Sequence, residues 1–126
     1  MEGKVVALFV SPERGVRNAV DLVRVFPEGL EGDRFRREVL LVDEETLLEA
    51  GMQVGGMKEN ITVRGLGLGQ SEPGARFRVG ADLVFEVGQK LACVGEDPAL
   101  TGKRGVFVRL TEGEGVIHKG DGVQRL

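Results

Sequence analysis

Residues 75–87 read Ala-Arg-Phe-Arg-Val-Gly-Ala-Asp-Leu-Val-Phe-Glu-Val, and this stretch decides the fold class. Apolar and charged side chains alternate on both sides of the pair Gly80-Ala81. Alternation with a period of two is typical of a half-buried strand, because successive side chains point to opposite faces. The stretch therefore predicts a β-hairpin with one face in a core and arginines opposite acids on the other face.

Short apolar runs before and after this hairpin predict further strands. The chain contains 20 glycines, spread at intervals that separate these runs. The expected strands cover residues 4–10, 19–25, 39–42, 61–63, 106–110 and 116–118. About eight short strands have edges that need protection, and closure into a barrel removes those edges.

Helical patterns are few and short. Asp43 resembles an N-cap, Glu44 and Glu45 suit the first turn of a helix, and Gly51 ends the pattern. A single helical turn is expected over 96–100, where Pro98 takes the first helical position. The sequence thus predicts one mostly β domain over residues 1–126, with one or two short helices.

Composition excludes several classes of protein. Of the 126 residues 41% are hydrophobic and 29% charged, and the net charge is −3 with no Trp or Tyr, which argues against nucleic acid as a partner. No apolar run approaches the roughly 20 residues of a membrane span, and no signal-peptide pattern is present, so a cytoplasmic location without a membrane partner is expected. One Cys and one His are too few for an intramolecular zinc site.

Cys93 is the single thiol, so it is the candidate for chemistry on sulfur or on a soft metal. Lys90 lies three residues before it, and Lys103 and Arg104 follow one loop later. Nearby positive charge favours the thiolate, which ligates metals and carries sulfur. A lone cysteine is also often a small buried apolar residue, and this alternative stays open.

Two other segments carry candidate ligand-binding groups. Arg34 and Arg37 follow a glycine-flanked segment, 29–33, and such a cluster is either an anion site or a solvated turn. Asn60 either braces a turn or presents its amide to a ligand. His118 near the end of the chain is expected to be a surface or structural residue.

Taken in order, these segments resemble the MOSC domain, named for the C-terminal domain of molybdenum cofactor sulfurase. The resemblance covers nearly the whole chain. It rests on Gly-Leu-Glu-Gly-Asp-Arg at 29–34, Lys-Glu-Asn-Ile-Thr-Val at 58–63, Pro-Gly-Ala-Arg-Phe-Arg-Val-Gly at 73–80, the strand that leads to Cys93, and Lys-Gly-Asp-Gly-Val at 119–123. Phe35 stands where many members have His, so any role of that His is lost here.

The resemblance implies a closed β-barrel of the pyruvate-kinase β-barrel-domain type, with Cys93 at the position of the family's cysteine. It also implies an association with molybdenum cofactor, with sulfur transfer or with reduction of N-hydroxylated compounds. A sulfur donor or a redox protein would be the partner. Pyridoxal phosphate chemistry is not expected, because the aminotransferase-like domain that brings it is absent from this sequence.

Two hypotheses about function follow from these residues. In the first, Cys93 ligates molybdenum or carries sulfur as a persulfide. The phosphate of the pterin is then held by Arg34, Arg37, Lys90, Lys103 and Arg104, and Asn60 braces the pocket or bonds the pterin. In the second, the barrel is a non-catalytic module that binds an anionic small molecule or a partner protein, and Cys93 is structural.

Overall fold

The computed structural model describes residues 2–34, 39–68, 71–92 and 104–126. The strands are β1 (Glu2–Val10), β2 (Asn18–Val20), β3 (Leu22–Phe26), β4 (Gly29–Leu30), β5 (Val39–Asp43), β6 (Ile61–Arg64), β7 (Arg76–Val79), β8 (Leu83–Ala92), β9 (Arg104–Glu112), β10 (Gly115–His118) and β11 (Gly122–Arg125). Within these ranges one helix is present, α1 (Glu44–Glu49). The mostly β class predicted from the sequence is confirmed.

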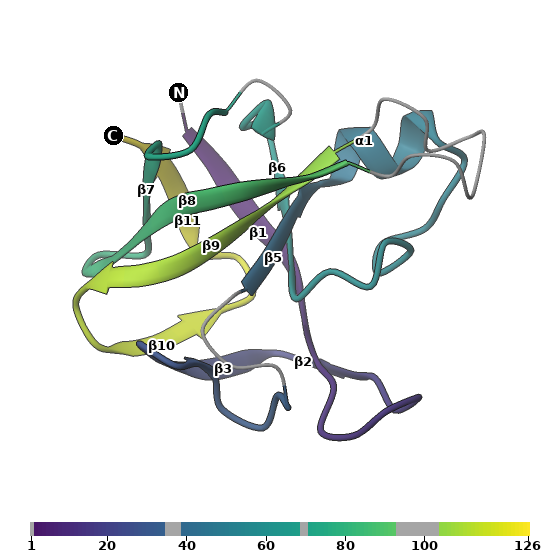
Figure 1. Cartoon of the computed structure of the whole chain (residues 1–126), viewed down its shortest axis with the longest axis horizontal. Coiled ribbons are helices and arrows are strands. Elements are labelled where there is room, and N and C mark those ends of the chain that lie inside the picture. Colours follow the sequence, from purple (N-terminus) through teal and green to yellow (C-terminus); the bar gives the residue numbers. More distant parts are fainter. Residues whose placement is uncertain (1, 35–38, 69–70, 93–103) are drawn as a thin grey trace.

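Seven strands close into a barrel (Figure 1). Their order is β11-β7-β8-β9-β5-β6-β1, and β1 returns to β11 through the pair Gly3 and Val123. All neighbours in the ring are antiparallel except β5 and β6, which run parallel. Outside the ring, β2 pairs with the end of β1, and β10, β3 and β4 form a separate small sheet. Closure was the predicted solution to the problem of strand edges.

The hairpin predicted from residues 75–87 is present as β7 and β8. Phe77 lies opposite Phe85, and both side chains are almost fully buried in the core of the barrel. The turn contains Gly80 at a φ of 65°, which a residue with a Cβ adopts only at a cost. On the other face Arg76 lies opposite Glu86 as expected, but Arg78 lies opposite the buried Val84 and not opposite an acid.

The predicted strand over 19–25 is in fact two strands in different sheets. β2 extends the barrel sheet beside β1, and the chain then turns at Asp21 into β3 of the small sheet. Two short apolar runs with one polar residue between them look like one strand in the sequence. They are two strands because the first run pairs with β1 and the second pairs with β10 in the other sheet.

The helix α1 confirms the predicted helix and its predicted N-cap residue. Asp43 occupies the N-cap position without a side-chain capping bond. It is also the last residue of β5, whose five residues are all buried, so its carboxylate is directed into the protein. There its Oδ2 accepts a hydrogen bond from the backbone N–H of Leu68. The second predicted helical turn, at 96–100, lies outside the described residues.

Candidate functional site

The main candidate site is a pocket at the amino ends of β5 and β6, where loops from three parts of the chain meet. Its volume is about 570 Å³, within the range of small-molecule sites. We call it the cationic pocket. Its lining residues are Ser11, Arg14, Gly15, Arg17, Asp33, Arg34, Lys58 and Asn60.

The segment that contains Arg34 is fastened to the end of β1. The buried carboxylate of Asp33 accepts a hydrogen bond of 2.7 Å from the backbone N–H of Ser11. The backbone N–H of Arg34 donates to the carbonyl of Ser11 at 2.9 Å, and one guanidinium nitrogen lies 3.4 Å from the Ser11 hydroxyl. These contacts hold Arg34 at the wall of the pocket.

Asn60 joins three strands of the barrel beneath the pocket. Its side-chain oxygen accepts from the backbone N–H of Leu40 at 3.0 Å, and its amide nitrogen donates to the carbonyl of Phe9 at 3.3 Å. Its backbone also bonds to both of these residues. Asn60 is 7% exposed, so these contacts favour the bracing role over direct contact with a ligand.

A fully buried carboxylate lies behind the pocket wall. Glu59 is 0% exposed and accepts hydrogen bonds from the backbone N–H groups of Gly55 (2.9 Å) and Met57 (3.1 Å) and from the Thr62 hydroxyl (2.6 Å). These bonds hold the loop that carries Lys58, whose backbone has a φ of 58° although it is not glycine. Such left-handed geometry is uncommon outside glycine and persists only where neighbouring contacts impose it.

Arg17 reinforces the same loop from the opposite side. Its two terminal nitrogens donate to the backbone carbonyls of Lys58 and Glu59, and its guanidinium lies 5.3 Å from the centre of the Phe9 ring. This geometry combines hydrogen bonds with a cation–π contact. Sequence reasoning missed Arg17, which lies with Arg14 in the loop that follows the first strand.

The charge of the pocket suits an anion. Four cationic side chains line it, and its one carboxylate, Asp33, is occupied by the backbone of Ser11. The whole chain has a net charge of −3, so this concentration of positive charge is local. Guanidinium and ammonium groups donate charge-assisted hydrogen bonds to phosphate oxygens, which are the strong class of such bonds.

The remaining predicted site residues are not brought into this pocket by the described chain. Arg37, Cys93 and Lys103 lie outside the described residues. Lys90 and Arg104 are described by their backbones, which lie in β8 and β9, with Lys90 opposite Val106 and Ala92 opposite Arg104.

The strand register separates the backbone of Arg104 from the pocket. Leu40, which bonds to Asn60, pairs with Phe107 of β9. Arg104 lies three residues before Phe107 on β9, on the side toward the carboxyl end of β5. Three residues of a strand span about 10 Å, so the backbone of Arg104 lies about that far from the level of Leu40.

A third buried carboxylate, Asp43, lies at that other end of β5. Burial raises the pKa of Asp43 from 3.8 to about 6, and the hydrogen bond from the Leu68 N–H opposes the shift. Its Oδ1 is buried without a hydrogen-bond partner among the residues that the structure describes. A buried acceptor without a partner disfavours the charged form, because the lost contact with water is not replaced.

Within the described ranges, two kinds of feature are absent. No group of three or more His, Cys, Asp or Glu side chains there could hold a metal ion. No helix in those ranges is long and apolar enough to cross a membrane. The side chain of His118 is 58% exposed, in agreement with the surface position expected from the sequence.

No family model matches the sequence, and no curated protein matches it. Solved structures are similar to the fold over almost the whole chain. The YuaD protein from Bacillus subtilis is similar with a TM-score of 0.80 at 16% identity, over 99% of this chain and 96% of that one.

Two YiiM structures are also similar, with TM-scores of 0.73. The one from Geobacillus stearothermophilus is 17% identical, over 98% of this chain and 75% of that one. The one from Escherichia coli is 19% identical, over 100% of this chain and 70% of that one. At this level of identity the comparisons show the fold alone, and they support the MOSC-like fold that the sequence motifs indicate.

Proposed function

We propose that the chain is a MOSC-like barrel that binds molybdenum cofactor or a related phosphate-bearing pterin, with its phosphate in the cationic pocket. The observation that carries the proposal is the gathering of Arg14, Arg17, Arg34 and Lys58 around one cavity in an acidic chain. Asp33, Arg34, Lys58 and Asn60, which line the cavity, belong to segments on which the family resemblance rests.

The donor set fits the phosphate end of such a cofactor. Arg17 is already held by two backbone carbonyls and a ring, so it contributes charge from a fixed position. Arg14 and Lys58 are exposed at the rim, where a bound anion can be reached without displacing a buried contact. Pre-positioned charge costs less on binding than charge that must first be ordered.

In this proposal Cys93 carries out the chemistry on the metal or on sulfur. As a thiolate Cys93 would ligate the metal, and as a persulfide it would carry a sulfur atom for an acceptor. When bound, molybdenum cofactor supplies redox chemistry at the metal. In this proposal the described cationic side chains bind the phosphate, and the hydrogen bonds of Asn60 and Glu59 hold the loops of the cationic pocket in place.

A second candidate function is a non-catalytic module that binds an anionic small molecule. The cationic pocket supports it, because its four cationic side chains come from described loops and do not include Cys93. In this case the cationic pocket binds its anion without help from Cys93.

Intact mass spectrometry under non-denaturing conditions separates these two functions. The wild-type chain and Cys93→Ala are produced in a host that makes molybdenum cofactor. A bound pterin or an added sulfur atom that is lost in Cys93→Ala supports the first function. A pterin or other anion retained equally by both proteins supports the binding module, and an unmodified mass for both contradicts stable cofactor binding.

A further inference from the structure

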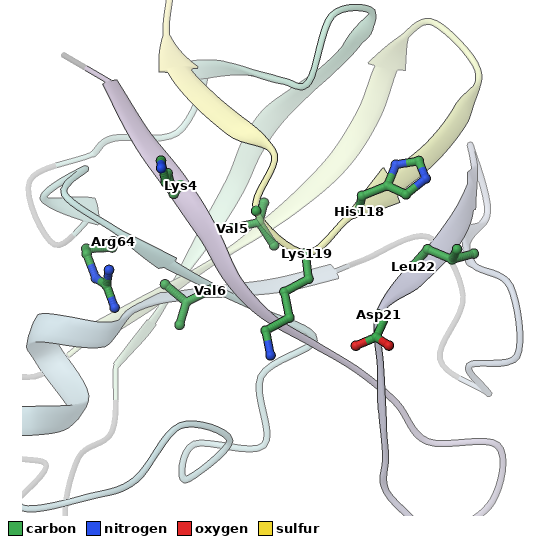
Figure 2. A pocket seen from close by; sticks show the side chains of 9 residues that line it. Lys4, Val5, Val6, Asp21, Leu22, Arg64, His118 and Lys119 are labelled. Carbon is green, nitrogen blue, oxygen red and sulfur yellow. The ribbon is translucent and has the colours of Figure 1, made fainter.

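A second concave surface lies on the outside of the barrel beside β1 (Figure 2). We call it the β1 groove. It is bordered by Lys4 and Val6 of β1, by Asp21 and Leu22 at the start of β3, by Arg64 at the end of β6, and by the turn 118–120. Its volume is about 690 Å³, and it shares no residue with the cationic pocket.

Positive charge dominates this groove. Lys4, Arg64 and Lys119 are cationic, and Asp21 is the one acid among the lining residues. Arg64 already bonds to the Glu44 carboxylate at 2.9 Å. In the part of the chain that the structure describes, neither Lys4 nor Lys119 forms an ion pair with a carboxylate. Two ammonium groups therefore remain available for a negatively charged ligand.

Apolar side chains lie between these charges. In Figure 2, Val6 lies between Arg64 on one side and Lys119 on the other. Leu22 extends the apolar surface beyond Asp21 and is 55% exposed, the second largest exposure among the large apolar side chains of the described chain. An exposed apolar side chain beside unpaired cations is suited to a ligand that has both an apolar body and a negative charge.

The backbone around the groove is fixed in place. The N–H of Lys119 donates to the carbonyl of Asp21, and the N–H of Gly120 donates to the carbonyl of Val5, both at 2.8 Å. A further bond of 2.8 Å runs from the Val5 N–H to the carbonyl of Asp121. These bonds tie the turn 118–121 to β1 and β3, so the shape of the groove does not have to form when a ligand binds.

We propose that the β1 groove binds a small organic monoanion, a carboxylate attached to an aromatic or aliphatic body. The ammonium groups of Lys4 and Lys119 attract the carboxylate, and the body lies on the neighbouring apolar side chains of Val6 and Leu22. Asp21 selects against a second negative charge at the far end, because like charges in one cavity repel each other. This site is separate from the proposed cofactor pocket and does not depend on it.

The test uses 2-naphthoate as the probe and 2-naphthalenemethanol as its uncharged counterpart. Backbone amide NMR shifts are followed while each compound is added to the isotope-labelled chain at low salt. For the naphthoate, we expect saturable shifts at Val6, Leu22 and Lys119. The naphthalenemethanol, which lacks the charge, should bind more weakly by about fivefold or more.

Two charge-reversal variants locate the binding. The double variant Lys4→Glu and Lys119→Glu should bind naphthoate about tenfold more weakly, since each exposed ionic contact is worth up to about 1 kcal/mol. The control Arg14→Glu reverses one charge in the cationic pocket and should leave naphthoate affinity unchanged. The fold of each variant is checked by its amide spectrum.

Three outcomes would overturn the proposal. The first is the absence of saturable shifts up to millimolar naphthoate. The second is equal binding of the charged and uncharged probes. The third is loss of binding in Arg14→Glu with retention in the double variant, which would place the anion in the cationic pocket.

Discussion

Replacing Asp43 by Asn should remove a pH dependence from the stability of this protein. Asp43 is buried, its Oδ1 has no hydrogen-bond partner among the described residues, and burial raises its pKa from 3.8 to about 6. Asn has nearly the same shape and stays uncharged, and its oxygen can still accept from the Leu68 N–H. The substitution therefore removes the charge and keeps the contact.

The sign follows from the two pKa values. Between pH 3.8 and about 6 the folded state binds a proton at Asp43 that the unfolded state has released. Asp43 therefore adds stability that is fully present below pH 3.8, and this stability is lost as the pH rises through about 6. One pKa unit corresponds to about 1.4 kcal/mol, so the change between about pH 4.5 and 7.5 is on the order of 2 kcal/mol.

The assay is urea unfolding of the wild type and Asp43→Asn at both pH values. The free energy of unfolding of the wild type minus that of Asp43→Asn should fall by about 2 kcal/mol as the pH rises. Asp82→Asn, at an exposed position in the β7–β8 turn, serves as the control and should show no comparable change. A difference between wild type and Asp43→Asn that stays constant across the range, or that rises with pH, would refute the argument.

Three further predictions concern the loop behind the cationic pocket and the packing of β9. Glu59→Ala leaves two N–H groups and the Thr62 hydroxyl without their acceptor, so the free energy of unfolding should fall by at least about 3 kcal/mol, and Glu59→Gln should be intermediate. Equal urea midpoints for both variants and the wild type would be inconsistent with this role. Gly105→Ala places a Cβ 2.6 Å from a Val42 methyl group and should lower the free energy of unfolding by about 1–3 kcal/mol. Gly88→Ala, whose nearest contact is at 3.9 Å, is the matched control in thermal unfolding, and equal losses of stability in the two variants would contradict the packing argument. Lys58→Val should destabilise the protein by about 1 kcal/mol or more, because a β-branched residue fits the φ of 58° poorly, whereas Lys58→Gly should not destabilise it. If urea unfolding shows Lys58→Gly to be the less stable variant, the loop changes conformation and the argument fails.

The local part of the fold could be predicted from the sequence. The alternation over 75–87 places Phe77, Val79, Leu83 and Phe85 on one face, and all four are buried. The short helix after Asp43 was also recognisable, because acidic first-turn residues and a terminal glycine act over a few positions. Signals of this kind need no knowledge of distant segments.

Pairings between distant segments could not be predicted in the same way. The break between β2 and β3 depends on β1 and β10, which lie on either side of it in the chain. Asp43 is buried at the end of β5, a strand that is paired with β6 on one side and with β9 on the other. A capping pattern read over four residues does not contain this information.

The candidate site shows the same division. Arg34 and Asn60 were singled out because Arg34 belongs to a basic cluster after a glycine-flanked segment and Asn60 has an amide that can bind a ligand, and both line the cationic pocket. Arg14, Arg17 and Lys58 were missed because they come from loops that meet only when β1, β5 and β6 are paired. Glu59 was missed as a structural residue because a charged side chain in a polar loop is usually exposed.

The central claim is that the cationic pocket holds the phosphate of a pterin cofactor. The most direct measurement is the pterin content of the protein purified from a host that makes molybdenum cofactor, determined by fluorescence after unfolding and oxidation. The wild type is compared with the double variant Arg14→Glu and Arg34→Glu, and with Lys4→Glu and Lys119→Glu as a control of equal charge change. The account predicts pterin in the wild type and the control and its loss in the double variant. Equal pterin content in all three proteins, or none in any of them, would contradict it.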